Sequence, residues 1–353
     1  MSIDVRTPAE RDAILADPGF GRHVTDHMVV ADWSSTGGWT VPRVTPYGPL
    51  TLQPSAAVLH YSQEIFEGLK AYRHADGGIH LFRPERNARR FAASARMLAL
   101  PELAEQDFLD AVAALLRADH AWVPDGTGER SLYLRPFTVA TEPFLGVRAA
   151  AEATFAVIGG PAGAYFPGGV TGIGLWVSTE HSRAAPGGTG AAKCGGNYAA
   201  GLAAQAEAKA RGCDQVLFLD ATEHRWLEEA GTMNVVVVTA DGTLATPPLG
   251  TILDGVTRHS VLTLAPEHGL VPVERPIAID EVLRGCADGS VTEVFAVGTA
   301  AVVTPVTSLV HAGVTTTVGD GAPGPHALAI REHLTDIQYG RAADVHGWMR
   351  RVV

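Results

Sequence analysis

The chain is poor in cysteine, and this shortage removes two classes of site from consideration. Its three cysteines, Cys194, Cys213 and Cys286, are odd in number and form no CxxC pair. Neither a disulfide framework nor a thiolate metal site is therefore indicated, and we expect a reducing compartment. No HExxH or comparable pair occurs among the fourteen histidines, so no metal is predicted.

Charge and long apolar runs are also scarce. Charged residues make up 18% of the 353 residues and hydrophobic residues 46%, which fits a compact globular enzyme and excludes a disordered chain. The net charge of −11 argues against a nucleic-acid partner, because such binding depends on exposed Lys and Arg. No apolar run approaches the length of a membrane span. We expect a cytoplasmic protein that acts on small molecules and has no membrane partner.

The length exceeds what one hydrophobic core usually supports, so two domains are expected. The stretch GGPAGAYFPGG, residues 159–169, is dense in glycine and proline and is the best candidate for a connection. We predict a small amino-terminal domain over residues 1–160, an interdomain loop over 161–174 and a large domain over 175–353. The first forty or so residues indicate only a dimer-contacting or surface extension.

Apolar periodicity gives a coarse list of elements. In the first half we predict strands at residues 56–59, 79–82, 131–140 and 154–158, a helix from Pro84 through Leu98, and a helix around residues 108–116. In the second half we predict strands at 173–178 and 214–219, a helix over about 197–211 ended by Gly212, a hairpin turning at Asp241-Gly242, a helix capped by Asp254 and continuing to about His268, and a last helix from about Pro325. Strands in hairpins with helices in separate blocks predict an α+β fold.

The most informative stretch is GGTGAAKCGGNYAAG, residues 187–201, in which Lys193 lies inside a glycine-dense loop that leads into a helix. Glycines let a large ligand come close to the main chain. A phosphate-binding P-loop fails because Ala192 precedes the lysine and Cys194 follows it. Two interpretations stay open: a flexible surface loop with a solvated lysine, and a lysine that binds a cofactor covalently as a Schiff base.

A Schiff-base lysine needs an acid that can pair with a pyridine nitrogen. Glu229 in EEAGTMN precedes an apolar strand, where a buried carboxylate is costly unless it has a partner. A protonated pyridine would be such a partner, whereas the alternative is a solvated glutamate beside Glu228.

The cofactor also needs a phosphate site and a hydroxyl near the ring oxygen. The stretch LDGVTRHS, from Leu253, opens a helix whose first N–H groups could bind an anion. An arginine should complement them, and Arg90, Arg83, Arg86 and Arg89 are equally eligible. Thr299 in GTAAVVTP could donate a hydroxyl. Tyr198, five residues after Lys193, could reach the same cofactor, although a tyrosine there is more often a packing residue.

Taken together, GGTGAAKCGGNY, EAGTMN, FEGLKAYR, SLYLRPF, PPLGTILDGVTR and GTAAVVTP closely resemble the branched-chain amino-acid aminotransferases, which are pyridoxal-phosphate enzymes of fold type IV. The resemblance runs from about Tyr47 to the carboxyl end. It implies a two-domain α+β fold like that of D-amino-acid aminotransferase, with a small α/β domain and a larger domain built on a pseudo-barrel of strands flanked by helices. The EAGTMN form is similar to the subgroup that includes the eukaryotic enzymes.

The resemblance also implies residue roles. Lys193 would bind pyridoxal 5'-phosphate covalently, Glu229 would pair with its pyridine nitrogen and Tyr198 with its ring oxygen. The phosphate-binding positions would be Arg90, Val256, Thr257 and Thr299. The substrate would contact Phe66, Tyr133, Arg135, Tyr165, Thr299 and Ala300, and Tyr61 would reach the pocket from the partner subunit of a homodimer.

We therefore expect ping-pong transamination between a branched-chain L-amino acid and 2-oxoglutarate, with Lys193 moving the proton. D-amino-acid aminotransferases and aminodeoxychorismate lyases are alternatives within the same fold. A phosphate-binding module without chemistry is an alternative outside it. Mammalian relatives carry a CxxC redox pair where this chain has Ala301 and Thr304, so a thiol switch at that position is not expected.

Overall fold

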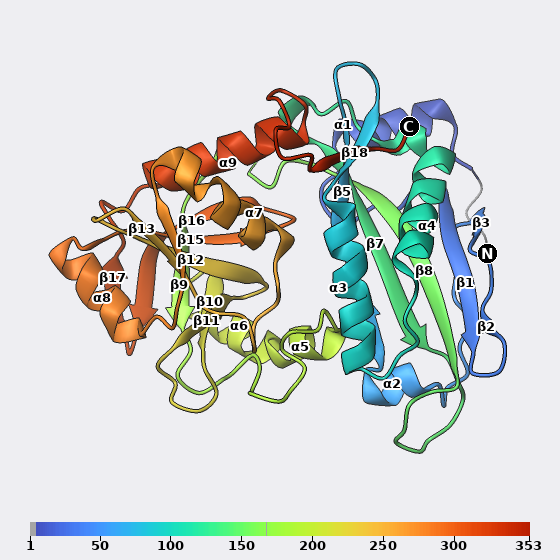
Figure 1. The fold of residues 1–353 in the computed structure, drawn as a ribbon, viewed down its shortest axis with the longest axis horizontal. Coiled ribbons are helices and arrows are strands. Elements are labelled where there is room, and N and C mark those ends of the chain that lie inside the picture. The colour runs from blue at the N-terminus through green and yellow to red at the C-terminus, as the bar shows by residue number, and fades with distance from the viewer. Residues whose placement is uncertain (1–4, 167) are drawn as a thin grey trace. The chain divides into compact units, whose positions relative to one another are not determined.

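The computed structural model describes residues 5–166 and 168–353, which form two compact units (Figure 1). The first unit contains the described residues up to 166 together with Ala192–Gly195 and Asp336–Val353, and the second contains Gly168–Ala191 and Gly196–Thr335. Each unit has its own sheet and its own helices, which confirms the predicted α+β class. The domain bounds expected from the sequence remain a prediction.

The sheet of the first unit is antiparallel, with the order β18-β6-β5-β7-β8-β1-β2; β3 pairs with β1 and β4 with β7. Its strands are β1 (His27–Ser34), β2 (Gly38–Trp39), β3 (Arg43–Pro46), β4 (Glu64–Phe66), β5 (Leu69–Arg73), β6 (Ile79–Phe82), β7 (Ser131–Ala140), β8 (Glu152–Ala162) and β18 (Met349–Arg351). The predicted strands at 79–82, 131–140 and 154–158 are confirmed.

Helices α3 (Pro84–Met97) and α4 (Glu105–Ala118) lie along one face of this sheet (Figure 1). Both were predicted, and their apolar stripes face the sheet. Phe91 of α3, Phe108 of α4 and Phe155 of β8 form the centre of the core, with ring centroids 5.2 to 6.3 Å apart. The other helical segments of this unit are α1 (Pro8–Ala16), α2 (Ala57–Tyr61), and the 3-10 turns His120–Trp122 and Thr127–Glu129.

The strand predicted at residues 56–59 is wrong, because these residues begin the short helix α2. A four-residue apolar run does not distinguish a strand from a buried helical turn. Ser62 then adopts a left-handed conformation, with φ of 48°, and ends the helix just before β4. The strand of this region therefore starts only at Glu64.

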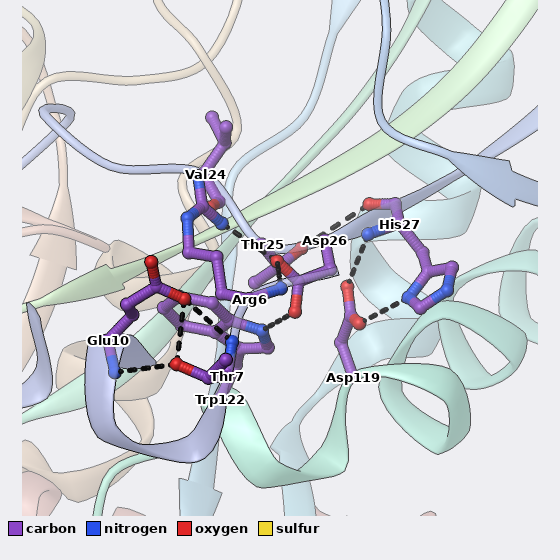
Figure 2. A network of polar contacts seen from close by, with 9 residues as sticks. All are labelled: Arg6, Thr7, Glu10, Val24, Thr25, Asp26, His27, Asp119 and Trp122. Carbon is purple, nitrogen blue, oxygen red and sulfur yellow. Dashed lines mark hydrogen bonds and ion pairs between the residues drawn. The ribbon is translucent and has the colours of Figure 1, made fainter. Parts of the chain in front are cut away.

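The first forty or so residues were expected to form a dimer-contacting or surface extension. A surface position holds for helix α1 but not for β1. Helix α1 has no buried residue, but β1 is an inner strand that pairs with β8 and β3. A polar network ties the two together (Figure 2). Asp26 accepts hydrogen bonds from Arg6 Nη1 at 2.9 Å and from Trp122 Nε1 at 2.8 Å, and His27 contacts Asp119 at 2.7 Å.

The second unit contains a sheet with the order β11-β10-β9-β16-β15-β12-β13-β14, with β17 beside β16. An additional pairing of β11 with β12 closes the strands from β11 to β12 into a barrel, as the resemblance implied. The strands are β9 (Ile173–Val177), β10 (Gln215–Leu219), β11 (Leu227–Ala230), β12 (Met233–Thr239), β13 (Thr243–Thr246), β14 (Val271–Glu274), β15 (Val291–Gly298), β16 (Val302–His311) and β17 (Val314–Thr317). The hairpin predicted at Asp241-Gly242 joins β12 to β13, and Gly242 has the positive φ of 85° that this turn requires.

The remaining helices are α5 (Gly195–Ala200), α6 (Leu202–Ala210), α7 (Val256–Leu264), α8 (Ile279–Asp288) and α9 (Pro325–Gln338), with a 3-10 turn at Ala265–His268. The single helix predicted over 197–211 is divided at Gly201. The cap predicted at Asp254 is also wrong: the N-cap of α7 is Gly255, which makes no side-chain capping bond. None of the helices within residues 5–166 and 168–353 has the length and apolar character that crossing a bilayer requires.

We predict that Asp26→Ala lowers the free energy of unfolding of the cofactor-free protein by about 2–4 kcal/mol, because the substitution leaves the buried Trp122 N–H without its acceptor and the Arg6 guanidinium, which keeps the Val24 carbonyl, without its ion-pair partner. Urea denaturation followed by circular dichroism measures the effect. Asp12→Ala, which removes an exposed carboxylate paired with Arg11, is the control and should leave stability unchanged. Equal stability of the two variants would contradict the anchoring role of Asp26.

Candidate active site

The backbone around Lys193 is held by the core of the first unit. Ala192 and Cys194 on either side are buried, with 0% and 2% exposure. The Lys193 amide donates to Ser94 Oγ at 2.9 Å, and its carbonyl accepts from the Phe66 amide at 2.9 Å. The interpretation of residues 187–201 as a flexible surface loop with a solvated lysine is therefore wrong at this point. The glycines instead allow a tightly constrained approach to the sheet.

The Lys193 amine lies 4.8 Å from the centre of the Phe66 ring. Its pKa is lowered from 10.5 to about 8, first by burial and then by the charges of Arg90 and Arg135, against the opposing effect of Glu67. A buried cation among cations favours its neutral form. At pH 7 about a tenth of this amine is thus unprotonated, far more than for an ordinary lysine, and the neutral form is the one that a nucleophile or a general base needs.

Arg90 is engaged by a carboxylate that sequence reasoning did not single out. Glu67 is fully buried and accepts from Arg90 Nε at 2.7 Å, from Arg90 Nη2 at 2.8 Å and from Asn87 Nδ2 at 2.8 Å. Burial raises the pKa of Glu67, but the Arg90 charge and hydrogen bonds outweigh it, and the pKa ends below its usual value. The signal was present in the sequence, since Glu67 is the one charged residue within IFEGL.

Phe66, Tyr133 and Arg135 surround the Lys193 amine from the same sheet face. The Arg135 guanidinium lies 4.6 Å from the Phe66 ring and donates to the Tyr133 hydroxyl at 3.1 Å. A Cβ at Gly68 would overlap that hydroxyl, so glycine is required there. Arg135 Nε is buried and has no partner among the described residues, which leaves a cationic donor for a ligand.

A cavity of about 250 Å³ in the first unit lies beside Tyr133 and Arg135. Phe20 and His23 from the amino-terminal segment line it, and the Phe20 ring packs edge-on against Tyr133 with centroids 5.2 Å apart. Sequence reasoning missed Phe20, because no local pattern shows that residues before the first strand return to this position.

Tyr61 and Tyr165 have aromatic side chains that lie partly at the surface. Tyr61, at the end of α2, donates its hydroxyl to the Leu145 carbonyl at 2.6 Å, and Tyr165 packs against Phe166. Both side chains are partly exposed, at 39% and 47%. Their assignment to the substrate pocket stays a prediction.

Glu229 is buried on β11 of the second unit, with 2% exposure. Its Oε1 accepts from Asn234 Nδ2 and from the Leu253 amide, both at 2.9 Å, and its Oε2 lies 2.6 Å from Arg183 Nε. The alternative of a solvated glutamate is wrong. The expected pairing of this buried carboxylate is supplied within the chain by Arg183, and the role of a pyridine nitrogen as a further partner stays a prediction.

The amino-terminal end of helix α7 has the features of an anion-binding site. Its N-cap is a glycine without a side-chain capping bond, so the first amides are not closed off by a local side chain. A Cβ at Gly255 would overlap Asn234 Oδ1, which explains why glycine is needed. Val256 and Thr257, the predicted phosphate-binding residues, form the first turn and are each 5% exposed.

The other predicted residues of the second unit are Tyr198, on a short helix, and Thr299 and Ala300, in a turn between two strands. Tyr198 is on α5 and lines a cavity of about 150 Å³ with Arg183, Asn197 and Thr232. Thr299 and Ala300 form the turn between β15 and β16, next to Val302, whose φ of 62° is unusual for a β-branched residue. Among the described residues, no group of three or more His, Cys, Asp or Glu side chains could hold a metal ion.

These features suit pyridoxal phosphate: a partly buried amine of lowered pKa, a buried carboxyl group that accepts several hydrogen bonds, and a helix start without a side-chain cap. The model of the class IV aminotransferases matches residues 64–309. The chain belongs to the class IV aminotransferases, the family that includes the branched-chain amino-acid aminotransferases.

Among curated relatives, the chain is 53% identical to the branched-chain-amino-acid aminotransferase of Mycobacterium tuberculosis over 355 residues, which cover 99% of this chain and 96% of the relative. The Escherichia coli branched-chain aminotransferase structure matches with a TM-score of 0.76 at 27% identity, over 92% and 99% of the two chains. The T.th. branched-chain aminotransferase with pyridoxamine 5'-phosphate matches at 0.75 and 30% identity, over 92% and 98%. The predicted family, fold type and cofactor, pyridoxal 5'-phosphate, are confirmed.

We predict that Lys193 in the cofactor-free protein reacts with a small acylating reagent at a rate that rises from pH 6 and levels off with a midpoint near pH 8, since only the neutral amine is nucleophilic. Peptide mass mapping after short exposures measures the rate. Lys209, exposed on α6, is the internal control for the reagent. A rate for Lys193 that still increases about tenfold per pH unit up to pH 10 would contradict the lowered pKa.

Proposed function

We propose that this chain catalyses the reversible transfer of an amino group between L-leucine, L-isoleucine or L-valine and 2-oxoglutarate, with pyridoxal phosphate as cofactor. The names of the relatives support the substrate class. The observation that carries the proposal is the partly buried amine of Lys193, whose pKa is lowered to about 8 and which lies 4.8 Å from the Phe66 ring, with the charges of Arg90 and Arg135 acting on it. An amine held neutral next to an aromatic wall suits proton transfer on an apolar amino acid.

Pyridoxal phosphate supplies an aldehyde that bonds to amines and an electron-withdrawing ring that stabilises a carbanion. In this proposal Lys193 holds the aldehyde carbon, Glu229 faces the pyridine nitrogen and Tyr198 faces the ring oxygen. The phosphate-binding residues are Arg90, Val256, Thr257 and Thr299. The uncapped first turn of α7 supports this assignment, and so does the fixed orientation of Arg90 on Glu67.

Lys193 is also the base in this proposal. With its Nζ free, Lys193 would take the proton from the substrate α-carbon and would donate it again at the aldehyde carbon of the cofactor, so that the base is restored. The backbone hydrogen bonds at its amide and carbonyl keep the start of the side chain fixed, so that only the methylene chain moves.

The specificity problem is that leucine is apolar whereas glutamate carries a second carboxylate. We assign the apolar wall to Phe66, with Tyr61 and Tyr165, and the charged edge to Arg135 and Tyr133. The buried Nε of Arg135, which has no partner among the described residues, supports this division, because a substrate carboxylate would supply the missing acceptor. Thr299 and Ala300 complete the predicted substrate contacts.

We further propose a homodimer in which Tyr61 enters the partner's pocket. Leu59, Tyr61, Leu145 and Val147 are large apolar residues with 39% to 84% exposure, and the hydrogen bond of Tyr61 to Leu145 joins their two segments. Such a group is typical of a surface that another chain covers. The cytoplasmic location expected from the sequence stays a prediction.

We predict that Lys193→Ala lowers kcat about 10³-fold or more, because it removes both the covalent anchor and the base. Borohydride treatment of the wild-type holoenzyme should fix the cofactor on the peptide that contains Lys193, whereas the variant should incorporate none. A wild-type protein that stays colourless after pyridoxal phosphate is added would instead favour a phosphate-binding module without chemistry.

We predict that Phe66→Ala lowers kcat/KM for L-leucine about 10- to 100-fold and changes the value for glutamate less, because the lost contact is apolar. Steady-state kinetics with both amino acids measures the difference. Assays with D-leucine belong in the same series: activity on D-leucine that exceeds activity on L-leucine would contradict the substrate assignment and favour a D-amino-acid aminotransferase.

A further inference from the structure

Arg183 is a buried residue, 7% exposed, to which the sequence assigned no role. Its guanidinium contacts three separate segments of the second unit. Its Nε lies 2.6 Å from Glu229 Oε2 on β11. Its Nη1 donates to the Gly190 carbonyl at 3.1 Å and to the Thr251 carbonyl at 3.2 Å.

The three segments are those on which the proposed cofactor site depends. Glu229 is the proposed partner of the pyridine nitrogen. Gly190 is three residues before Lys193, and Thr251 is five residues before Val256, at the start of α7. The backbone at Gly190 packs closely against the backbone at Thr251, because a Cβ at Gly190 would overlap the Thr251 carbonyl oxygen. The carbonyls of these two residues are the ones that accept from Arg183 Nη1. The planar, forked guanidinium group of Arg183 therefore sets the spacing of all three segments. A lysine, with a single ammonium group, could not reproduce this geometry.

The charge of Arg183 acts on Glu229 in particular. A buried carboxylate is stable in its ionised form only when neighbouring charges and donors compensate for lost water. Arg183 supplies the charge at Oε2, and Asn234 and the Leu253 amide supply donors at Oε1. Because the guanidinium forms an ion pair with the carboxylate, it stabilises the state in which Glu229 is negative. In that state the proton shared with the pyridine nitrogen stays on the nitrogen.

A second carboxyl group, that of Glu228, lies close enough to feel the Arg183 charge. Glu228 is 4% exposed, and its Oε1 accepts from Thr251 Oγ1 at 2.5 Å. Burial raises the pKa of Glu228, and the adjacent Glu229 charge adds to the effect, while the Thr251 hydrogen bond and Arg183 oppose it without cancelling it. The pKa of Glu228 therefore lies above its ordinary value, and the main hydrogen-bond partner of its carboxyl group is Thr251.

We propose that Arg183 is a positioning residue that keeps Glu229 ionised and correctly oriented, so that the proton between Glu229 and the cofactor stays on the pyridine nitrogen. The inference rests on the role proposed above for Glu229. It adds that the electron-withdrawing strength of the bound ring depends on a guanidinium that the cofactor itself need not touch.

The test uses holoenzyme reconstituted with pyridoxal phosphate labelled with ¹⁵N in the ring, whose nitrogen chemical shift reports protonation directly. Wild type should show a protonated ring nitrogen at pH 7.5. Arg183→Gln, which removes the charge, should show a deprotonated nitrogen and at least tenfold weaker binding of pyridoxal phosphate. Arg183→Lys, which keeps the charge but loses the fork, should keep the nitrogen protonated and still bind the cofactor several-fold more weakly.

Arg258→Lys is the matched control. Arg258 is also buried in the second unit, and it donates to Glu274 at 2.5 Å and to the Pro247 carbonyl at 2.7 Å. This variant should lower the melting temperature of the cofactor-free protein without changing the nitrogen shift or the cofactor affinity. The comparison distinguishes the general effect of losing a buried guanidinium from the specific effect of losing that of Arg183.

A protonated nitrogen with wild-type affinity in Arg183→Gln would overturn the inference. If that variant does not fold, wild-type affinity in Arg183→Lys would overturn it instead. Glu229→Gln tests the underlying assignment separately: a ring nitrogen that stays protonated in this variant shows that Glu229 is not its partner, and the proposed cofactor site then fails independently of Arg183.

Discussion

Two backbone hydrogen bonds hold Lys193 in place, one from its amide to Ser94 and one to its carbonyl from Phe66. They attach a glycine-rich segment, which would otherwise be among the most mobile parts of the chain, to a helix and a strand of a packed core. Because the backbone is fixed there, the amine is delivered among Phe66, Arg90 and Arg135, and these surroundings lower its pKa. Reactivity at this position is thus a consequence of packing.

Each unit also buries an ion pair next to its predicted functional residues. Glu67 holds Arg90 through two donors in the first unit, and Arg183 holds Glu229 in the second. A buried pair of this kind adds little net stability, but it fixes the direction of both side chains. In each pair the guanidinium balances the charge of its own carboxylate, so neither buried charge depends on a ligand for compensation.

The sequence predicted well the parts of the fold that are locally encoded. The alternation of β7 and the turn at Gly242 depend on neighbouring residues, and both were located correctly. The predictions failed where the local pattern is ambiguous, as in the four-residue apolar run at α2, and where a helical segment is interrupted, as at Gly201. In the site, motifs identified Lys193 and Glu229, but neither Arg183 nor Phe20 could be found, because their relation to these motifs exists only after folding.

Asn234 gives one further consequence. Its amide nitrogen binds Glu229, and its oxygen lies so close to Gly255 that no side chain fits there. A single amide therefore sets the separation between Glu229, the proposed partner of the heterocycle, and the start of α7, the proposed partner of the phosphate ester. Coenzyme analogues with a longer or shorter linker between ring and phosphorus would not match this fixed separation. The protein would therefore discriminate among such analogues by their length as well as by their charge.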